Sequence, residues 1–216
     1  MQLATTACGC CSLHGACFGV ELTIHNLAAV YYVDRFGLDL KTAGLYVGTF
    51  GLLALFARAL GGLISDRIAG KHGLDGRTAL LFVLILAEGF GLMAFAKMDT
   101  ALFALFAMVI FGLFTHMACG ATYALVPLIN RKALGGVAGI IGAGGNVGAV
   151  AAGFLMKGAD TTQQGLFVLG GIVVGAAFCA IGVRFSRAHK ITEQQLYDEA
   201  VAARAQLTAA SVQVNA

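Results

Sequence analysis

The sequence predicts an all-α membrane protein, a bundle of six transmembrane helices, and three observations support this fold class. Of the 216 residues, 59% are hydrophobic and only 12% are charged, whereas about a quarter of the residues of a soluble domain are charged. The mean hydropathy is +0.85. Apolar stretches of about 20 residues, the length that spans a bilayer, follow one another with short loops between them. A separate soluble domain therefore does not fit.

Six stretches are long and apolar enough to cross a membrane as helices. In chain order they are 11–33, 42–65, 78–97, 101–129, 133–156 and 164–186. We expect one transmembrane domain over 1–187, followed by a partly helical cytoplasmic tail over 188–216 in which Thr192 and Gln195 have capping-box spacing. We expect this tail helix to be solvated rather than bound to a partner. The N-terminus lacks the basic start and small-residue cleavage site of a signal peptide, so we expect it to lead into the first span.

The distribution of Lys and Arg predicts the orientation, because short cytoplasmic loops retain these residues. With an even number of spans, one side holds Arg67, Lys71, Arg77, Arg131, Lys132, Arg184, Arg187, Lys190 and Arg204, and the other holds Arg35, Lys41, Lys97 and Lys157. Both termini are therefore predicted to be cytoplasmic in a multi-pass protein of the cell (inner) membrane. The net charge of +3 reflects this asymmetry and does not indicate binding to nucleic acid.

The stretch "GIIGAGGNVGAV", residues 139–150, is glycine-rich and uncharged. A dinucleotide-binding loop counted from Gly142 would need a glycine where Val147 stands, and the stretch lies inside an apolar segment, so a phosphate-binding loop is excluded. As a helix it has two small-residue faces. One carries Gly135, Gly139, Gly142, Asn146 and Gly153, and the opposite one carries Gly144 and Gly148. Either neighbouring helices pack closely there and Asn146 bonds to one of them, or a cavity lies against the Asn146 face and its amide donates to a small solute.

Arg58 lies well inside the second predicted span. An arginine at the centre of a membrane helix costs about 2.5–3.5 kcal/mol, so it usually faces a cavity or a partner. A guanidinium is always charged and bidentate toward planar oxyanions. Because the neighbours of Arg58 on its helix face are mostly small, we favour a buried site for nitrate, nitrite or a carboxylate. The alternatives are an ion pair with Glu21 or Glu88, or a side chain that reaches the cytoplasmic end.

The first predicted span has polar side chains on a single face, and Glu21 and His25 are four residues apart, so they can pair directly. The full set on that face is His14, Phe18, Glu21, His25 and Tyr32. This face is either a proton relay or gate, or a pair that satisfies itself. For His116, which shares a face with Tyr123, we favour core packing with hydrogen bonds. The role of Glu88 stays open.

The close cysteines Cys8, Cys10 and Cys11 could bind metal or be lipidated, but they lack paired C-x-x-C spacing and a histidine partner in the loops. We therefore expect incidental thiols, and no metal and no cofactor. We also find no nucleophile elbow and no quinone or haem motif, so an enzyme is not expected.

The stretch "GVAGIIGAGGNVGAVAAGF" resembles the signature helix of the nitrate/nitrite porter family of the major facilitator superfamily, and it matches that pattern at Gly142, Ala143, Gly144, Gly145, Asn146 and Gly148. Three other stretches are similar to the family in the same order: "FGVELTIHNLAAVYYVDRFGL", "FARALGGLISDR" and "GATYALVPLINRKALGG". The resemblance covers the second half of a twelve-span transporter, spans seven to twelve.

This resemblance implies roles for particular residues. Arg58 matches the substrate arginine of span eight, and the signature residues named above match a helix that shapes the pore at the substrate. Gly62, Asp66 and Arg67 match a cytoplasmic hinge motif whose charge contacts stabilise one conformation. At one position, His14 stands where many relatives have a tyrosine.

The resemblance also implies a function, namely transport of nitrate or nitrite by alternating access, with this chain as the C-terminal half. The expected partners are the anion, the lipid bilayer, and either a separate N-terminal six-span half or another copy. Proton symport through Glu21, His25 or His116 and nitrate/nitrite exchange both stay open. The alternative is a non-transporting membrane interaction protein or an inactive truncated remnant.

Overall fold

The computed structural model describes the backbone of residues 2–183 and 185–214, and the side chains of 8–183, 185–203 and 206. The Arg184 and Arg204 side chains, which entered the predicted orientation, lie outside the described residues, as do residues 1, 215 and 216 of the two predicted domains. The described residues form helices and no strand, so the all-α prediction is confirmed. The helices are α1 (Gln2–Phe36), α2 (Leu40–Ala96), α3 (Ala101–Ile129), η1 (Arg131–Ala133), α4 (Leu134–Gly158), α5 (Thr162–Ala177), α6 (Cys179–Gly182) and α7 (Arg187–Val214).

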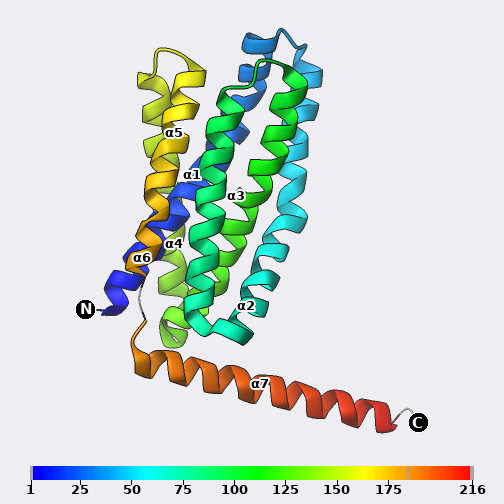
Figure 1. Ribbon diagram of the computed structural model, residues 1–216, viewed down its shortest axis with the longest axis vertical. Coiled ribbons are helices and arrows are strands. Elements are labelled where there is room, and N and C mark those ends of the chain that lie inside the picture. The colour runs from blue at the N-terminus through cyan, green and yellow to red at the C-terminus, as the bar shows by residue number, and fades with distance from the viewer. Residues whose placement is uncertain (1, 184, 215–216) are drawn as a thin grey trace.

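The long helix α2 contains a sharp reversal at Gly73. Gly73 has φ 58° and ψ −148°, a backbone conformation that is open to glycine and strained for other residues. The first arm of α2 runs to the end of the bundle where α7 lies, and the second arm returns alongside it (Figure 1). The two predicted spans at 42–65 and 78–97 therefore belong to the two arms of one element.

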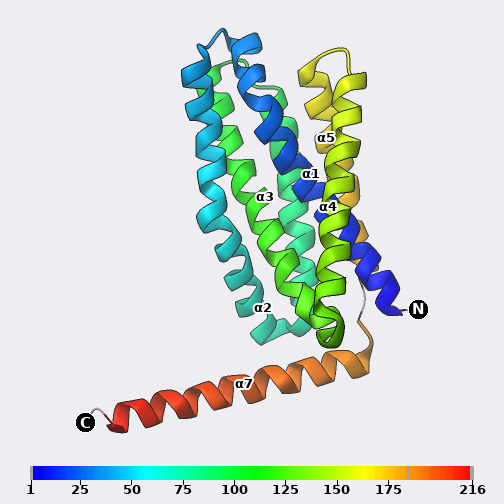
Figure 2. The same ribbon diagram turned by 180° about the vertical axis from the view of Figure 1, so that it is seen from behind.

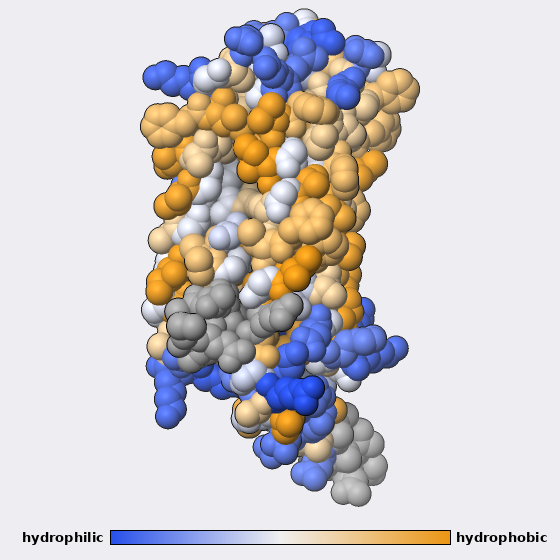
Figure 3. All heavy atoms as spheres, turned by 60° about the vertical axis from the view of Figure 1, so that its left-hand side comes forward, coloured by the Kyte–Doolittle hydropathy of each residue, from blue (hydrophilic) through white to orange (hydrophobic). Residues whose placement is uncertain are grey.

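Within the described part of the chain, four helical stretches are long and apolar enough to cross a membrane: Leu40–Ala96, Ala101–Ile129, Arg131–Gly158 and Thr162–Gly182. The first of these contains two predicted spans, and α1, with His14, Glu21, His25 and Asn26, is not among the four. The number six is therefore not confirmed, whereas a multi-pass membrane bundle is. An apolar belt lies between two polar ends of the surface (Figure 3), as a bilayer requires.

Short polar residues begin the helices and explain the brevity of the loops. The Asp39 carboxylate accepts a hydrogen bond from the Thr42 N–H at 3.0 Å at the start of α2. Thr100 caps α3 through the Phe103 N–H at 3.4 Å, and Asn130 caps η1. Such N-caps satisfy backbone donors that a helix leaves free at its first turn, so each apolar helix begins directly after a short loop.

The core lies between α1, both arms of α2, and α3. Large rings fill it: the Phe111 ring centroid is 5.4 Å from that of Phe95 and 5.8 Å from that of Phe50. Near Arg58 the helices instead approach through glycine, because a Cβ on Gly120 of α3 would overlap the backbone of Arg58. This contact presses the backbone that carries Arg58 directly against α3.

The tail helix α7 crosses one end of the bundle, the end at which the described part of α1 begins (Figures 1 and 2). Its first turns are attached to that end. Glu193 pairs with Arg131, with Nη2 and Oε2 2.5 Å apart, and Lys190 pairs with Asp75 at 2.6 Å. His189 Nε2 lies 2.6 Å from the Leu128 carbonyl oxygen. We expected a solvated helix, whereas the part of α7 nearest the bundle is docked on it.

Candidate anion site

Arg58, on the first arm of α2, forms an ion pair with Glu21 of α1. Its Nη2 lies 2.5 Å from Oε1 and 2.7 Å from Oε2 of the carboxylate. The Glu21 side chain is 7% exposed, and that of Arg58 is 41% exposed. Of the alternatives considered for Arg58, the pair with Glu21 is present, and its exposed portion leaves room for a second partner.

Glu21 has further neighbours on α3. His116 Nδ1 lies 3.6 Å from Glu21 Oε2, and the Cys119 thiol donates to the same oxygen at 3.6 Å. His116 is fully buried, and its Nε2 lies 3.0 Å from the Phe50 carbonyl oxygen. The core role favoured for His116 therefore fits its surroundings, and the Glu21 carboxylate joins α1, α2 and α3.

The direct contact between Glu21 and His25 is not formed among the described residues. His25 is exposed, and its ring packs edge-on against Phe50 with centroids 5.3 Å apart. Four-residue spacing places two side chains on one helix face, but here Glu21 turns toward Arg58 and His116 instead.

Arg58 keeps donors that Glu21 does not use. An arginine has five N–H donors, and both bonds to Glu21 come from Nη2. The Nε atom is buried and has no hydrogen-bond partner among the described residues. Because a buried donor without a partner is costly, this side of the guanidinium is suited to donate a hydrogen bond to an additional oxyanion.

The two small-residue faces of α4 meet different surroundings. Gly144 and Gly148 pack against α1, where a Cβ on either would overlap Cys11 or Gly15. Gly145 also faces α1, and a Cβ there would lie 2.9 Å from atoms of both His14 and Phe18. The close helix approach predicted from these glycines is therefore present on the α1 side.

The Asn146 face of α4 is open. The Asn146 side chain is exposed and donates to the Gly142 carbonyl oxygen of its own helix at 3.0 Å. Asn146 and Gly153 line an open groove of about 600 Å³ between α4 and α1, into which Thr23 and Asn26 also project. Within the described residues, Arg58 bonds to Glu21 and Asn146 to Gly142, and no hydrogen bond or ion pair joins Asn146 to Arg58, so the structure does not bring these two predicted site residues together.

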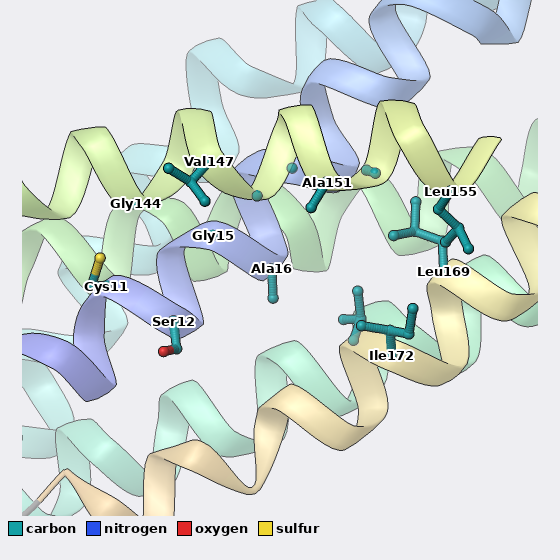
Figure 4. A pocket seen from close by; sticks show the side chains of 14 residues that line it. Cys11, Ser12, Gly15, Ala16, Gly144, Val147, Ala151, Leu155, Leu169 and Ile172 are labelled. Carbon is teal, nitrogen blue, oxygen red and sulfur yellow. The ribbon is translucent and has the colours of Figure 1, made fainter. Parts of the chain in front are cut away.

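A second groove, about 320 Å³ in volume, is apolar. It lies between α1, α4 and α5, and its lining side chains include Val147, Leu155, Leu169 and Ile172, with the Ser12 hydroxyl at its edge (Figure 4). No charged residue lines it. An anion would lose its hydration here without gaining a counter-charge, so this groove is not the anion site.

In the hinge motif, the partner of Asp66 is Arg77. Arg77 Nη1 lies 2.7 Å from Asp66 Oδ1 and donates to the Ser65 hydroxyl at 3.0 Å. Arg67 is exposed, and nothing lies within 4 Å of a Cβ placed on Gly62. The pair joins the two arms of α2. Nothing in the sequence distinguished Arg77 from Arg67 as the partner of Asp66, because it is the reversal at Gly73 that brings Arg77 back to Asp66.

The sequence did not assign a role to Glu88, which lies on the second arm of α2. It is fully buried, and neither carboxylate oxygen has a hydrogen-bond partner among the described residues. Arg58 is thus paired with Glu21 and not with Glu88. A buried carboxyl without a partner is far less costly in its neutral form than as an anion.

Comparison with known proteins identifies relatives among transporters. The chain is 35% identical over 195 residues to high affinity nitrate transporter 2.5 of Arabidopsis thaliana, covering 85% of this chain and 39% of that protein. It is 42% identical over 137 residues to nitrate transporter 2.2 of Chlamydomonas reinhardtii, covering 63% of this chain and 27% of that protein. A nitrate/nitrite transporter of Picosynechococcus is 34% identical over 138 residues, covering 62% of this chain and 24% of that protein.

The chain thus spans less than half the length of these curated relatives. No protein-family profile matches it. No solved structure matches it.

Proposed function

The chain belongs to the nitrate/nitrite porter family, and from that premise we propose that it supplies the C-terminal half of a nitrate or nitrite transporter that works by alternating access. Relatives from a plant, a green alga and a cyanobacterium are all named as nitrate transporters. We propose transport and not catalysis, in keeping with those relatives.

The observation that supports the proposal most directly is the half-exposed guanidinium of Arg58. Its charge is held by Glu21 through one nitrogen, while Nε has no partner among the described residues. Nitrate and nitrite are planar oxyanions, which suit the planar donors of arginine. The anion would add to Arg58 beside Glu21 or take the place of Glu21.

The charges at the site define what coupling requires. Arg58 and Glu21 sum to zero, so one bound anion leaves a net negative charge in a partly buried site. A proton on Glu21, or on His116 at 3.6 Å from it, would restore neutrality. Uptake against an inside-negative potential costs about 2.3 kcal/mol per charge per 100 mV. Proton symport through these groups would neutralise the negative charge of the occupied site and would also offset the charge that crosses the membrane. Exchange of nitrate for nitrite moves no net charge across the membrane, so it avoids the cost of the membrane potential.

We propose that a separate N-terminal six-span half, or a second copy, covers the side of the bundle formed by α4, α3 and the first arm of α2, with α1 between them (Figure 2). The relatives are more than twice as long as the stretch they share with this chain. Transport sites in such proteins lie between two halves near the membrane midplane. The open Asn146 groove and the exposed part of Arg58 would then face the partner.

We propose the cell (inner) membrane as the location, with both termini cytoplasmic. Basic residues support this orientation: Arg77, Arg131 and Lys190 are brought together at the end of the bundle where α7 lies. Retention of such residues on the cytoplasmic side is the rule for short loops.

The test is nitrate uptake in cells that lack their own porters. The chain is expressed alone and with a family-type N-terminal half, each as wild type and as Arg58→Lys. We expect uptake with the partner to fall at least tenfold in Arg58→Lys, because lysine keeps the charge and loses the planar donors. Arg35→Lys is the matched control, since Arg35 pairs with the exposed Asp99.

Two results would contradict the proposal. Arg58→Lys could match wild type in uptake and in nitrate-dependent thermal stability, which would make Arg58 a structural residue of a membrane interaction protein. Alternatively, no uptake in any pairing, with both chains present in the membrane, would indicate an inactive remnant.

A further inference from the structure

Two cysteines and a histidine meet in the core beside the Arg58–Glu21 pair, although their helices are far apart in the sequence. His14 and Cys17 come from α1, and Cys119 comes from α3. All three side chains are buried, at 0–1% exposure. Their ligand atoms lie within 4.8 Å of one another. The three therefore present one nitrogen and two sulfurs to a common point.

From this geometry we propose that His14, Cys17 and Cys119 bind a divalent metal ion of the zinc type, with a water molecule in the fourth position, as at zinc sites with three protein ligands. Tetrahedral zinc has bonds of about 2.3 Å to sulfur and about 2.0–2.1 Å to nitrogen, so sulfurs on one ion lie about 3.8 Å apart and a sulfur and a nitrogen about 3.6 Å apart. The Cys17 and Cys119 sulfurs are 3.4 Å apart, and Cys17 Sγ is 3.8 Å from His14 Nδ1. Small side-chain rotations suffice to close the shell.

Glu21 lies beside this cluster and does not belong to it. Its Oε2 accepts a hydrogen bond from the Cys119 thiol at 3.6 Å, and its Oε1 lies 2.5 Å from Arg58 Nη2. The carboxylate therefore remains the counter-charge of Arg58 while the three buried side chains bind the ion.

The charges of such a site sum to zero, which matters because its three side chains are buried. Two thiolates balance the two positive charges of the ion, histidine binds as a neutral ring, and the carboxylate balances Arg58. An uncompensated charge in this position would be costly. A monovalent ion in the same shell would leave one negative charge, so the ligand set selects a divalent ion.

Sequence spacing gave no indication of this site, and the absence of metal was the expectation. Zinc sites are recognised by closely paired ligands, and here Cys119 is 102 residues from Cys17. The cysteines that are close together in the sequence, Cys8, Cys10 and Cys11, lie near the N-terminus instead. Of these, Cys8 is exposed, and the Cys11 thiol donates to the Ile140 carbonyl oxygen.

Cobalt substitution on the purified full chain in detergent, with a reductant that does not bind metal, tests the proposal. Wild type is expected to bind one Co²⁺. The complex should show a thiolate-to-cobalt absorption band and the intense visible bands of tetrahedral Co²⁺. Addition of one equivalent of Zn²⁺ should abolish both spectral features. Cys119→Ser and Cys17→Ser should each weaken binding at least about tenfold. The control Cys8→Ser with Cys179→Ser removes two exposed thiols and should bind as wild type does.

The measurement on wild type tests the proposal by itself. The test therefore remains valid even if a variant fails to fold. Absence of a thiolate-to-cobalt band in folded wild type overturns the site. So does binding that survives in Cys17→Ser and is lost in the control, because the metal would then belong to the exposed thiols. Neither readout involves nitrate, so the result is independent of the proposed transport.

Discussion

At the scale of single residues, the ion pair between Arg58 and Glu21 determines which donors of the guanidinium are free. Glu21 is the more buried partner of the pair and also touches α3 through His116 and Cys119. It is therefore both the counter-charge of Arg58 and a junction of three helices. Under the proposed function, an arriving anion would compete with Glu21 for the same guanidinium, so the two hydrogen bonds that Glu21 accepts from Arg58 would set the affinity of the site.

Replacing Glu21 by glutamine should separate these two roles. The loss of a charged hydrogen-bonded pair is expected to lower the stability by about 1.5–3 kcal/mol. Nitrate should then stabilise Glu21→Gln more than it stabilises wild type, because Arg58 has lost its competitor. Thermal unfolding in detergent, with and without nitrate, measures both effects. Glu199→Gln, on an exposed site of α7, is the control, and equal nitrate shifts in all three proteins would show that Arg58 does not bind the anion.

Asp39 should make the start of α2 sensitive to acid. Hydrogen bonds from the side chain and backbone of Thr42 lower the pKa of Asp39, so the ionised carboxylate stabilises the folded state above the ordinary aspartate pKa. This contribution is lost as the pH falls through the lowered pKa of the folded state. Hydrogen exchange of the first turn of α2 should therefore accelerate with acid beyond the intrinsic pH dependence. Asp39→Ala should show fast exchange at every pH, and an acid effect that persists in that variant would exclude Asp39 as its source.

The sequence indicated the important residues of the site better than it indicated their contacts. Arg58 and Glu21 stand out because charged side chains are rare inside apolar spans. Choosing between Glu21 and Glu88 as the partner, however, depends on how α1 and the second arm of α2 are placed against α3. Helix periodicity gives the face of each residue and not the neighbour across the gap.

At the scale of the elements, α1 and α4 pack backbone to backbone. Gly144 and Gly148 of α4 lie against Cys11 and Gly15 of α1, which is the small-residue contact that membrane helices use for close approach. The glycine spacing left close packing open as one of two alternatives, and close packing is what the Gly144 and Gly148 face shows. It did not show which of the two glycine faces would meet α1, because both faces have the same kind of residue.

Adding a methyl group to each face of α4 should give opposite results. A Cβ on Gly148 would overlap the backbone of Gly15, so Gly148→Ala is expected to lower stability by about 1–3 kcal/mol. Gly139 has nothing within 4 Å of its Cβ position, and Gly139→Ala should raise stability by up to about 1 kcal/mol, the difference in helix propensity. Far-UV circular dichroism is the suitable probe, since the chain has no tryptophan. If Gly139→Ala were the more damaging change, α4 would be facing the other way.

The docking of α7 is a second property of an element that the sequence did not predict. The pairs Arg131–Glu193 and Lys190–Asp75 join residues more than 60 positions apart. The bond from Glu193 also raises the pKa of Arg131. Composition predicted a solvated helix here. The polar residues that attach α7 to the bundle are of the same types that face water on other helices, so composition does not distinguish the two cases.

Glu193→Gln should loosen α7 from the bundle. The Glu193 side chain is 8% exposed, so its pair with Arg131 is worth more than an ordinary surface pair of about 0–1 kcal/mol. We expect faster hydrogen exchange in residues 187–200, with the helices of the bundle unchanged. Glu199→Gln again serves as the control, since Glu199 is exposed. Unchanged exchange in Glu193→Gln would mean that the contacts of His189 and Lys190 are enough to hold the helix.

At the scale of the whole molecule, the chain forms a membrane bundle with one side left open. The outer helices α5 and the second arm of α2 cover one side (Figure 1), while α1, α4 and the first arm of α2 lie on the other side (Figure 2), where α1 and α4 form most of the Asn146 groove. The sequence established the all-α membrane class from composition alone. The count of six spans did not follow as directly, because polar side chains, among them His14, Glu21, His25 and Asn26, interrupt the apolar run of α1 and because α2 holds two predicted spans in one element.

The reversal in α2 also has a mechanical consequence. Only Gly73 departs from helical geometry between the two arms, and the Arg77–Asp66 bond ties the arms together next to it. There is no slack segment between the arm that holds Arg58 and the arm that holds Glu88. A tilt of the first arm would therefore apply torque to the second, and an anion that tilts the first arm when it binds Arg58, as the proposed function requires, would turn the far side of the bundle as a rigid body.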